Sequence, residues 1–232
     1  MSSGIFRYGV AMAAKPPPEA PFHKQLTRDS VVAEAMALLD QEGLEALTMR
    51  SLADRLGVVP NALYRHVKDK GDLMDGVLDR VTSLVEVPDP ALGWRAGFTA
   101  LATNIRATML AHPAIANLVI ARPNLGPNSI IIGEFGFAVT LAAGFTPAHA
   151  ERSLNLVLTY TLGFVALEVP RIHEPEVSAE ELQQIYEGIP PELFPNTLVV
   201  QPGPGELVTQ AQFEFGLERV MDSLAGFEGE AG

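Results

Sequence analysis

The stretch LADRLGVVPNALYRHVKDKGDL, residues 52–73, decides the fold. Aliphatic residues lie at helical spacing on both sides of Gly57, and Pro60 follows shortly after this glycine. Glycine commonly ends a helix because it accepts left-handed backbone angles, and proline is tolerated in a first helical turn, where its missing N–H would have no partner. Two short helices joined by the turn LGVV are therefore expected, which is a helix-turn-helix.

Capping residues extend this prediction in both directions. Thr27 can cap a helix that stops at Gly43, and Thr48 can cap the first helix of the pair. Asp69 can cap a longer helix that runs to about Val85. The inward side of that longer helix is predicted to carry aliphatic residues at helical spacing: Leu73, Val77, Leu78, Val81 and Leu84.

The second helix of the pair, expected from Val59 to about Val67, has two different faces. On a helical wheel Leu63 and Val67 point inward. The opposite face carries an amide, an aromatic ring and two bases: Asn61, Tyr64, Arg65 and Lys68. Such side chains suit the base edges and phosphates of a DNA major groove. The alternative is an ordinary amphipathic helix, but solvation alone gives so short a helix little reason to expose a tyrosine beside two bases.

Charge is distributed unevenly along an acidic chain. The 232 residues carry a formal net charge of −12. Residues 1–70 contain nine Lys or Arg and eight Asp or Glu, whereas residues 71–232 contain seven and twenty. This asymmetry indicates that only the N-terminal part meets a polyanion, although charge alone favours the simpler explanation of a solvated segment.

The composition limits the class of protein. Hydrophobic residues make up 47% of the chain, which is ample for a core, and there is no cysteine for a disulfide, a zinc site or a thiol nucleophile. Arg7 and Gly9 interrupt the N-terminal apolar residues and KPPPEAP follows, so residues 1–25 are expected to form a flexible arm and not a signal peptide. The longest uncharged apolar stretch, residues 153–167, is too short and too polar to span a bilayer. We expect a soluble, cytoplasmic protein.

The sequence lacks the motifs of the common enzyme classes. It contains no GxGxxG, GxxxxGK[ST], GxSxG or HExxH, and its five histidines lack metal-ligand spacing. The carboxylate-rich residues 174–192 are expected to form a solvated loop and a short helix. We therefore expect neither a catalytic site nor a metal or other cofactor.

Residues 86–232 are expected to form a helical domain of their own after the linker VEVPDPALG. Helices are predicted over residues 94–110, 114–121, 129–143, 146–168 and 206–224. The helix over residues 146–168 is apolar on nearly every side and must therefore be covered on nearly every side. A chain of this size cannot cover it alone, so a homodimer through this helix and the last one is expected.

Residues 47–78, LTMRSLADRLGVVPNALYRHVKDKGDLMDGVL, resemble the DNA-binding domain of the tetracycline-repressor (TetR) family of bacterial transcription regulators. The shared pattern is a threonine-capped helix, Leu-Ala, Leu-Gly-Val, Leu-Tyr-x-His-Val and Lys-x-Lys. The resemblance implies double-stranded operator DNA as a partner. It implies base contacts by Arg50, Pro60, Asn61 and Tyr64, and backbone contacts by His66 and Lys70. The full set of candidate DNA-binding residues is Thr48, Arg50, Pro60, Asn61, Ala62, Tyr64, Arg65, His66 and Lys70.

The C-terminal part resembles the ligand-binding domain of the tetracycline-repressor subgroup. The resemblance is carried by ARP at residues 121–123, TLGFVALE at 161–168 and FEFGLE at 213–218. It implies a four-helix dimer interface and a pocket between the linking helices and the central one. It also implies that a pair of helices joined by a proline-containing hinge carries the ligand signal to the DNA-binding domain. The loop ARPNLGPN, residues 121–128, is expected to abut the pocket and to pass this signal on, because its prolines and glycine can absorb a change at the end of the preceding helix.

The ligand is where this sequence departs from the subgroup. Tetracycline repressors hold a magnesium-chelated drug through a histidine, and the matching residue here is Leu118; polar pocket positions are matched by Leu101, Ile105 and Gly136. A hard metal ion needs oxygen or imidazole ligands, so we expect no metal and a small, largely apolar effector. The candidate ligand-binding residues are Trp94, Phe98, Leu101, Ile105, Leu118, Arg122, Asn155, Tyr160 and Glu168. The polar ones among them could equally be satisfied core groups or surface ion pairs.

These patterns together predict an all-α protein in three parts. They are the arm over residues 1–25, a three-helix helix-turn-helix DNA-binding domain over 26–72, and a ligand-binding and dimerisation domain over 73–228. The expected function is a transcriptional repressor that a small molecule releases from a palindromic operator. The alternative is an architectural DNA-binding protein without an effector, which would need no pocket.

Overall fold

The computed structural model describes residues 26–122, 126–172, 177–201, 203 and 206–230, and within these residues all regular structure is helical. The predicted arm, residues 1–25, lies outside the described residues. A head is formed by α1 (Arg28–Glu42), α2 (Met49–Leu56), α3 (Pro60–Leu63) and α4 (Lys70–Thr82). A body is formed by α5 (Gly93–Ala111), α6 (Pro113–Ala121), α7 (Pro127–Ala142), α8 (Pro147–Glu168) and α11 (Gln210–Leu224).

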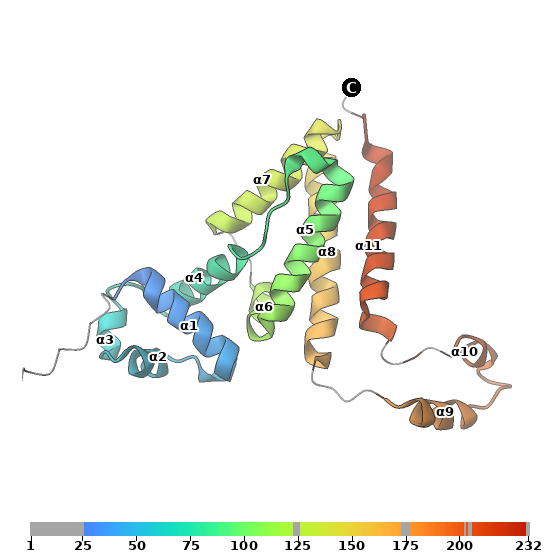
Figure 1. The fold of residues 1–232 in the computed structure, drawn as a ribbon, viewed down its shortest axis with the longest axis horizontal. Coiled ribbons are helices and arrows are strands. Elements are labelled where there is room, and N and C mark those ends of the chain that lie inside the picture. The colour runs from blue at the N-terminus through green and yellow to red at the C-terminus, as the bar shows by residue number, and fades with distance from the viewer. Residues whose placement is uncertain (1–25, 123–125, 173–176, 202, 204–205, 231–232) are drawn as a thin grey trace, which may run out of the picture.

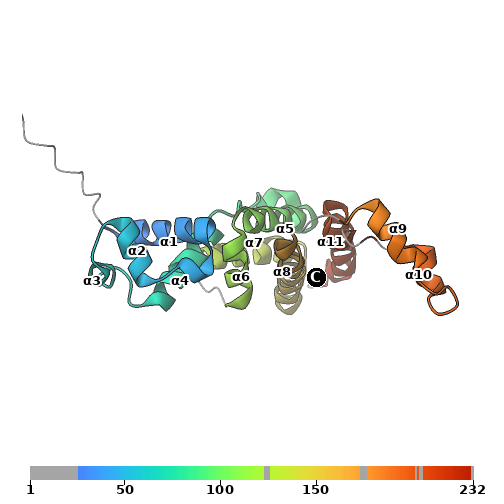
Figure 2. The ribbon, with the colours of Figure 1, turned by 90° about the horizontal axis from the view of Figure 1, so that it is seen from below.

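The head and the last helix lie at opposite ends of the body (Figure 1). Two short helices, α9 (Ala179–Glu187) and α10 (Pro195–Val200), project beyond α11 and away from the head in both views (Figures 1 and 2). Single 3-10 turns connect or extend the helices: η1 (Leu44–Ala46), η2 (Pro90–Leu92), η3 (Val169–Arg171), η4 (Glu206–Val208) and η5 (Ala225–Phe227).

The predicted caps of the head are confirmed. The Thr27 hydroxyl accepts the Ser30 backbone N–H at 3.1 Å, and the Ser30 hydroxyl accepts the Thr27 N–H at 2.9 Å. Thr48 and Ser51 form the same reciprocal pair at the start of α2, with both distances at 3.0 Å. Because each pair satisfies two backbone donors that a helix start leaves open, short helices can begin at these residues. Gly57 ends α2 with φ at +66°, the left-handed conformation that glycine adopts without strain.

The helix α3 is shorter than its predicted span. It ends at Leu63 rather than near Val67, and residues 64–66 form turns. The His66 N–H donates to the Leu63 carbonyl at 2.8 Å, an i to i+3 bond that tightens the chain. The Lys68 N–H then donates to the Asp72 carboxylate at 2.8 Å. This bond attaches the segment after α3 to the first turn of α4.

Two other helix ends also differ from the prediction. The helix α4 ends at Thr82, and Leu84, which was expected to point inward, lies beyond the end and is 52% exposed. The last helix begins at Gln210 because the Thr209 hydroxyl accepts the Gln212 N–H at 3.1 Å and acts as its cap. Residues 206–208 form the separate 3-10 turn η4.

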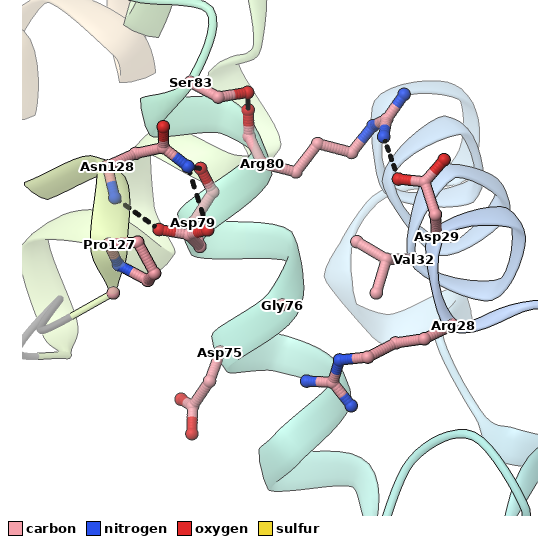
Figure 3. A pocket seen from close by; sticks show the side chains of 11 residues that line it. Arg28, Asp29, Val32, Asp75, Gly76, Asp79, Arg80, Ser83, Pro127 and Asn128 are labelled. Carbon is pink, nitrogen blue, oxygen red and sulfur yellow. Dashed lines mark hydrogen bonds and ion pairs between the residues drawn. The ribbon is translucent and has the colours of Figure 1, made fainter.

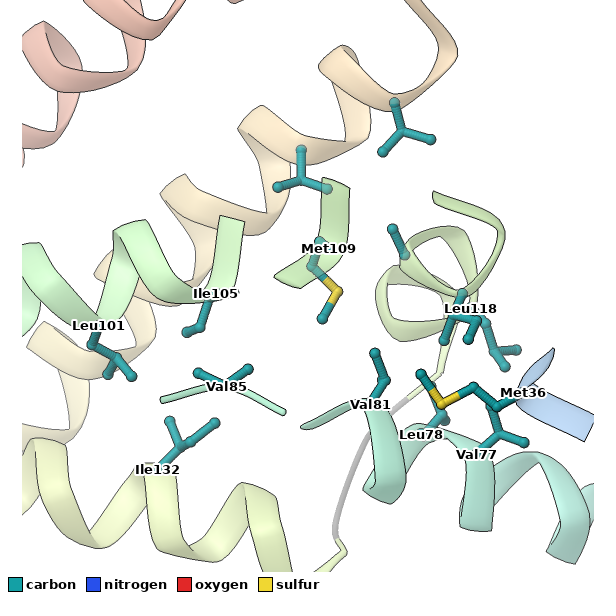
Figure 4. Packing of buried hydrophobic residues seen from close by; sticks show 14 of the residues in the cluster. Met36, Val77, Leu78, Val81, Val85, Leu101, Ile105, Met109, Leu118 and Ile132 are labelled. Atoms are coloured by element: carbon teal, nitrogen blue, oxygen red, sulfur yellow. The ribbon is translucent and has the colours of Figure 1, made fainter. Parts of the chain in front are cut away.

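The buried side chains form one cluster that continues from the head into the body. Figure 4 shows Val77, Leu78 and Val81 of α4 beside Met36 of α1 and Leu118 of α6. The helix α4 is therefore shared by the two parts, although sequence patterns divide the parts near its first turn. A displacement of α4 must repack both parts, because protein cores are densely packed.

The helix α8 lies at the centre of the body and packs against α5, α6, α7 and α11. By length and composition the segment Pro147–Arg171 could also cross a membrane, a criterion that the core helix of a globular protein meets equally well. Part of its apolar surface stays uncovered within one chain, since Leu156 is 41% and Leu167 is 46% exposed. On the neighbouring α11, Phe215 is 58% exposed.

Candidate DNA-reading head and ligand cavity

A few buried side chains hold α3 in place. Leu63 is fully buried and Val67 is 2% exposed, and both belong to a cluster that includes Leu52 and Ala53 of α2. The Val58 N–H closes the turn by donating to the Ala53 carbonyl at 3.0 Å. The side chains that the helical wheel places opposite are exposed: Asn61, Tyr64, Arg65 and Lys68. The predicted division into a buried and an exposed face is confirmed.

An ion pair braces the segment that follows α3. The Arg28 guanidinium donates to both oxygens of Asp72, at 2.7 and 2.9 Å, and to the His66 carbonyl at 3.1 Å. The hydrogen bond from Arg28, followed by the one from the Lys68 backbone, lowers the pKa of Asp72 from 3.8 to about 2. The brace ties the segment that follows α3 to the first turns of α1 and α4.

The bases of the head fall into two groups. Arg55 donates to Glu34 at 2.7 Å and to Glu42 at 3.0 Å, so it ties α2 to α1, a role that its place in the basic stretch did not indicate. Within the described residues, no carboxylate oxygen lies within 4 Å of the charged nitrogens of the other bases of α2 and of the segment from α3 to the start of α4: Arg50, Arg65, Lys68 and Lys70. Unpaired exposed bases beside a short helix present a positive surface to phosphates.

The other predicted DNA-binding residues lie close by but have different surroundings. Pro60 is exposed as the first residue of α3, whereas Ala62 and His66 are half-buried. The Thr48 hydroxyl is already engaged with Ser51. The nine candidates therefore lie within the continuous segment from the cap of α2, through α3 and the turns after it, to the start of α4, and their contacts with DNA stay a prediction.

An apolar cavity of about 540 Å³ lies where the end of α4 meets the body. Its walls come from α4, α5, α6, α7 and α8, and Val85, which follows α4, also lines it. The polar groups on the described walls are few: Thr82, Arg122, Ser129 and Asn155. Arg122 is the one charged side chain among these described lining residues. The volume and the mostly apolar lining are typical of small-molecule sites.

Only some of the predicted ligand-binding residues line this cavity. Ile105, Arg122 and Asn155 do, together with residues that sequence reasoning missed: Met109, Val119, Ile130, Phe137, Leu158 and Leu162. Six others lie outside it: Trp94, Phe98, Leu101, Leu118, Tyr160 and Glu168. The missed residues are spaced along four helices, α5, α6, α7 and α8, that converge only in the folded chain, so no local pattern marks them.

Packing explains where the six other residues lie. Trp94 packs on Phe145 with ring centroids 5.3 Å apart, and the Tyr160 hydroxyl donates to the Phe213 carbonyl of α11 at 2.8 Å. Phe98 and Leu101 are fully buried in the core, and Leu118 is directed towards α4 (Figure 4). For these residues the structure supports core packing in place of the cavity role that was expected.

Glu168 belongs to a buried ion pair outside the cavity. The Arg106 guanidinium donates to both of its carboxylate oxygens, at 2.8 and 2.6 Å, and Arg106 is only 8% exposed. The same guanidinium donates to Gln210 and lies over the ring of Phe213, 4.7 Å from its centroid. This cluster links α5, α8 and α11, so Glu168 fixes the helices of the body together.

The start of α7 is hydrogen-bonded to α4. Asp79 of α4 accepts the Asn128 backbone N–H and its side-chain amide, each at 2.9 Å, and the Asp79 carbonyl accepts the same amide at 3.2 Å (Figure 3). Gly126 lies so close that a Cβ added there would be 2.3 Å from the Asp79 carboxylate. We call this contact the α4–α7 joint. It connects the end of the predicted signalling loop to the helix that carries the head; residues 123–125 of that loop lie outside the described residues.

An ion pair and a histidine–carboxylate contact also connect the head to the body. Arg122, which ends α6, donates to Asp75 of α4 at 2.8 Å. His112, which precedes α6, lies 2.9 Å from Asp40 of α1. Both ends of α6 are therefore linked to the head.

A more open groove of about 620 Å³ lies between α1, α4 and the start of α7 (Figure 3). Its charged side chains already have partners, since Arg80 contacts Asp29 at 2.8 Å and Asp79 is held by Asn128. A ligand there would have to break these pairs. The apolar cavity is therefore the better candidate for a ligand site.

Two family models match the chain, one over the head and one over the body. The model for "Bacterial regulatory proteins, tetR family" matches residues 31–77, and the model for "Tetracyclin repressor-like, C-terminal domain" matches residues 87–227. An HTH-type transcriptional regulator of Saccharopolyspora erythraea is 38% identical over 152 residues. The match covers 65% of this chain and 64% of that protein, so the chain spans less than two thirds of the length of this relative.

Solved structures share the fold over most of the chain. The Streptomyces coelicolor protein ActR, in complex with actinorhodin, has a TM-score of 0.80 and 31% sequence identity, and the match covers 90% of this chain and 100% of that one. BioQ, with its double-stranded DNA operator, has a TM-score of 0.62 and 28% identity, and the match covers 87% and 99%. The similarity thus includes one structure with a small molecule and one with DNA.

Proposed function

The chain belongs to the tetR family of bacterial regulatory proteins, and we propose on this premise that it is a ligand-responsive transcriptional repressor. It binds a palindromic operator as a homodimer and leaves it when a small, largely apolar effector fills the cavity. The observation that carries the proposal is that α4 serves both sites. Lys70 begins this helix in the head, and Thr82 ends it on the cavity wall.

The division of labour in the head follows from the chemistry of its side chains. Arg50, Asn61 and Tyr64 can reach base edges and set sequence preference, whereas His66 and Lys70 contact the DNA backbone and mainly set affinity. The unpaired state of Arg50 and Lys70 supports this proposal, because neither base must first leave a carboxylate to meet a phosphate or a guanine. The solved complex of BioQ with its operator supports a DNA-bound state for this fold.

Dimerisation is proposed through the uncovered face of α8 and α11. Leu156, Leu167 and Phe215 leave apolar surface exposed on these two helices. Covering that surface with a second copy removes it from water and places two heads on one particle. The two heads can engage a palindrome when their recognition helices match successive major grooves, about 34–36 Å or a multiple apart.

The effector is proposed to be largely apolar, without a metal. No carboxylate and no imidazole belong to the described lining of the cavity, so a magnesium chelate would lack the protein ligands that it requires. The complex of ActR with actinorhodin supports the binding of a small molecule by a protein of this fold. Because the relatives are regulators and no motif of a common enzyme class is present, we propose a non-enzymatic protein that works in the cytoplasm.

DNA binding is testable with the DNA that flanks the protein's own gene. A labelled duplex that contains an inverted repeat from that DNA should bind the dimer in fluorescence anisotropy. Lys70→Ala should weaken binding to all sequences alike and reduce the salt slope by about 1, whereas Tyr64→Ala should cost roughly 1–3 kcal/mol of discrimination at one position of each half-site. If Lys70→Ala changed base preference and Tyr64→Ala did not, the assignment of roles would be wrong.

Ligand response is testable by linkage. A thermal-shift screen with largely apolar compounds, both neutral and anionic, identifies ligands, which are then titrated with and without operator DNA. Coupling of about 1–3 kcal/mol is typical, and operator DNA must weaken ligand binding by the same factor by which the ligand weakens DNA binding. Equal affinity in both titrations for neutral and anionic ligands alike would favour the architectural DNA-binding protein, which needs no effector.

A further inference from the structure

Arg122 belongs to two sites at once. It lines the apolar cavity, and its Nη2 atom lies 2.8 Å from Oδ1 of Asp75 on α4. Neither partner is deeply buried, because the two side chains are 40% and 61% exposed. Exposed ion pairs of this kind contribute little stability, so a competing anion can break this one at low cost.

The α4–α7 joint behaves differently. Asp79 and Asn128 share several hydrogen bonds, and neither residue belongs to the described lining of the cavity. A ligand in the cavity therefore reaches one of these two attachments to α4 and not the other. The attachment within its reach is the weaker, single ion pair.

We propose that the effector carries an anionic oxygen group, such as a carboxylate, that competes with Asp75 for Arg122. This inference rests on the proposed function and names the chemistry and the regulation of the same cavity. The apolar walls bind the body of the effector, and its anionic group binds the guanidinium of Arg122. The end of α6 is then no longer linked to α4 through Asp75.

Two features of the surroundings favour this exchange. Among the described lining residues Arg122 carries the only charge, so an anion in the cavity has one cation to bind. After the exchange Asp75 still has a cation nearby, the guanidinium of Arg28. The pKa of Arg28 is raised mainly by its hydrogen bond with Asp72, and the charge of Asp75 adds to this rise.

The exchange also explains how binding becomes a signal. In the state without effector, Arg122 holds the end of α6 to the helix that carries the head. In the state with effector, the same guanidinium faces the cavity and α4 loses that link. An apolar compound without an anionic group fills the cavity but leaves the ion pair intact, so it should bind without much effect on DNA affinity.

Matched acids and amides test the proposal in the absence of DNA. The probes are anthraquinone-2-carboxylate, 2-naphthoate and 9-anthroate, each paired with its neutral carboxamide and titrated by calorimetry. Asp75→Asn removes the competitor, so at least one acid should bind about two- to fivefold more tightly than it binds the wild-type protein, the range that an exposed ion pair supports. The matching amide should bind with unchanged affinity, and Arg122→Gln should abolish the preference for acid over amide.

Asp29→Asn is the matched control. It removes the same charge from the same groove, but Asp29 pairs with Arg80 and does not contact Arg122. The proposal would be overturned if the acids gained as much affinity in Asp29→Asn as in Asp75→Asn. It would also be overturned if no acid gained more affinity in Asp75→Asn than its matching amide. If Asp75→Asn lost helical content by circular dichroism, Asp75→Ala would replace it, since alanine favours the helix.

The two hypotheses fail separately. None of these titrations contains DNA, so a negative result leaves the proposed repressor function standing. A protein that ignores every operator duplex but gains affinity for acids in Asp75→Asn would overturn the repressor function and keep the assignment of Arg122.

Discussion

Replacing Gly126 with alanine should break the α4–α7 joint from outside the cavity. The backbone of Gly126 has φ at −68°, which alanine adopts without strain, so the substitution acts through its Cβ alone. That Cβ would lie 2.3 Å from Oδ1, 2.8 Å from Cγ and 2.9 Å from Cβ of Asp79. These distances are far below van der Waals contact, so the Asp79 carboxylate must turn away and the backbone at residue 126 must shift from α4, which releases Asn128.

The magnitude follows from the bonds that are lost. Asp79 accepts two hydrogen bonds from Asn128 with its carboxylate, both at 2.9 Å. A hydrogen bond to a charged group contributes about 1.5–3 kcal/mol net, and water will hydrate the displaced, half-buried carboxylate in part. We expect Gly126→Ala to lower the free energy of unfolding by about 2 kcal/mol, close to the value of one such bond.

Urea unfolding at a fixed protein concentration measures this loss, with Trp94 as the reporter. This residue is the single tryptophan of the chain and is 6% exposed in the folded body. Asn128→Ala removes bonds of the same joint, so the double variant should lose clearly less than the sum of the two single losses. Gly226→Ala is the control, because a Cβ there meets nothing within 4 Å. Full additivity, or a Gly126→Ala protein as stable as the wild type, would refute the reasoning.

The remaining predictions concern the dimer, the head and the buried ion pair. Phe215→Glu should produce monomers in sedimentation velocity with little loss of helicity, and a dimer that persists at micromolar concentration would exclude this face as the interface. The folded-state pKa of Asp72 is lowered to about 2 from 3.8, so its contribution to stability is complete above pH 3.8 and disappears as the pH falls through about 2. The difference in unfolding free energy between wild type and Asp72→Asn should shrink over that interval, and a constant difference would contradict the brace. Arg106→Met should lower the free energy of unfolding by about 3 kcal/mol, because it leaves the carboxylate of Glu168 without its partner; an equally stable variant in urea unfolding would show that the pair contributes nothing.

The helix-turn-helix could be predicted from the sequence because its determinants are local. Thr48 lies three residues from Ser51, and the capping bonds between them form within a single turn. Gly57 and Pro60 act through their own backbone angles, and so the pattern alone places the turn. The same argument holds for α8, where Thr146 caps a helix that runs to Glu168 as predicted.

The pairing of acids and bases that lie far apart in the sequence was decided by the tertiary structure alone. Glu168 was expected to face a ligand, but it pairs with Arg106, 62 positions away, and Arg122 lies 47 positions from its partner Asp75. A helical pattern gives the face on which a side chain lies, and several long side chains can reach any one face. Which acid meets which base depends on how the helices pack, and that packing is set by the whole core. The sequence by itself therefore determined that this chain builds a DNA-reading head on a helical body, and only the tertiary structure decided that Arg122 lies between the cavity and α4.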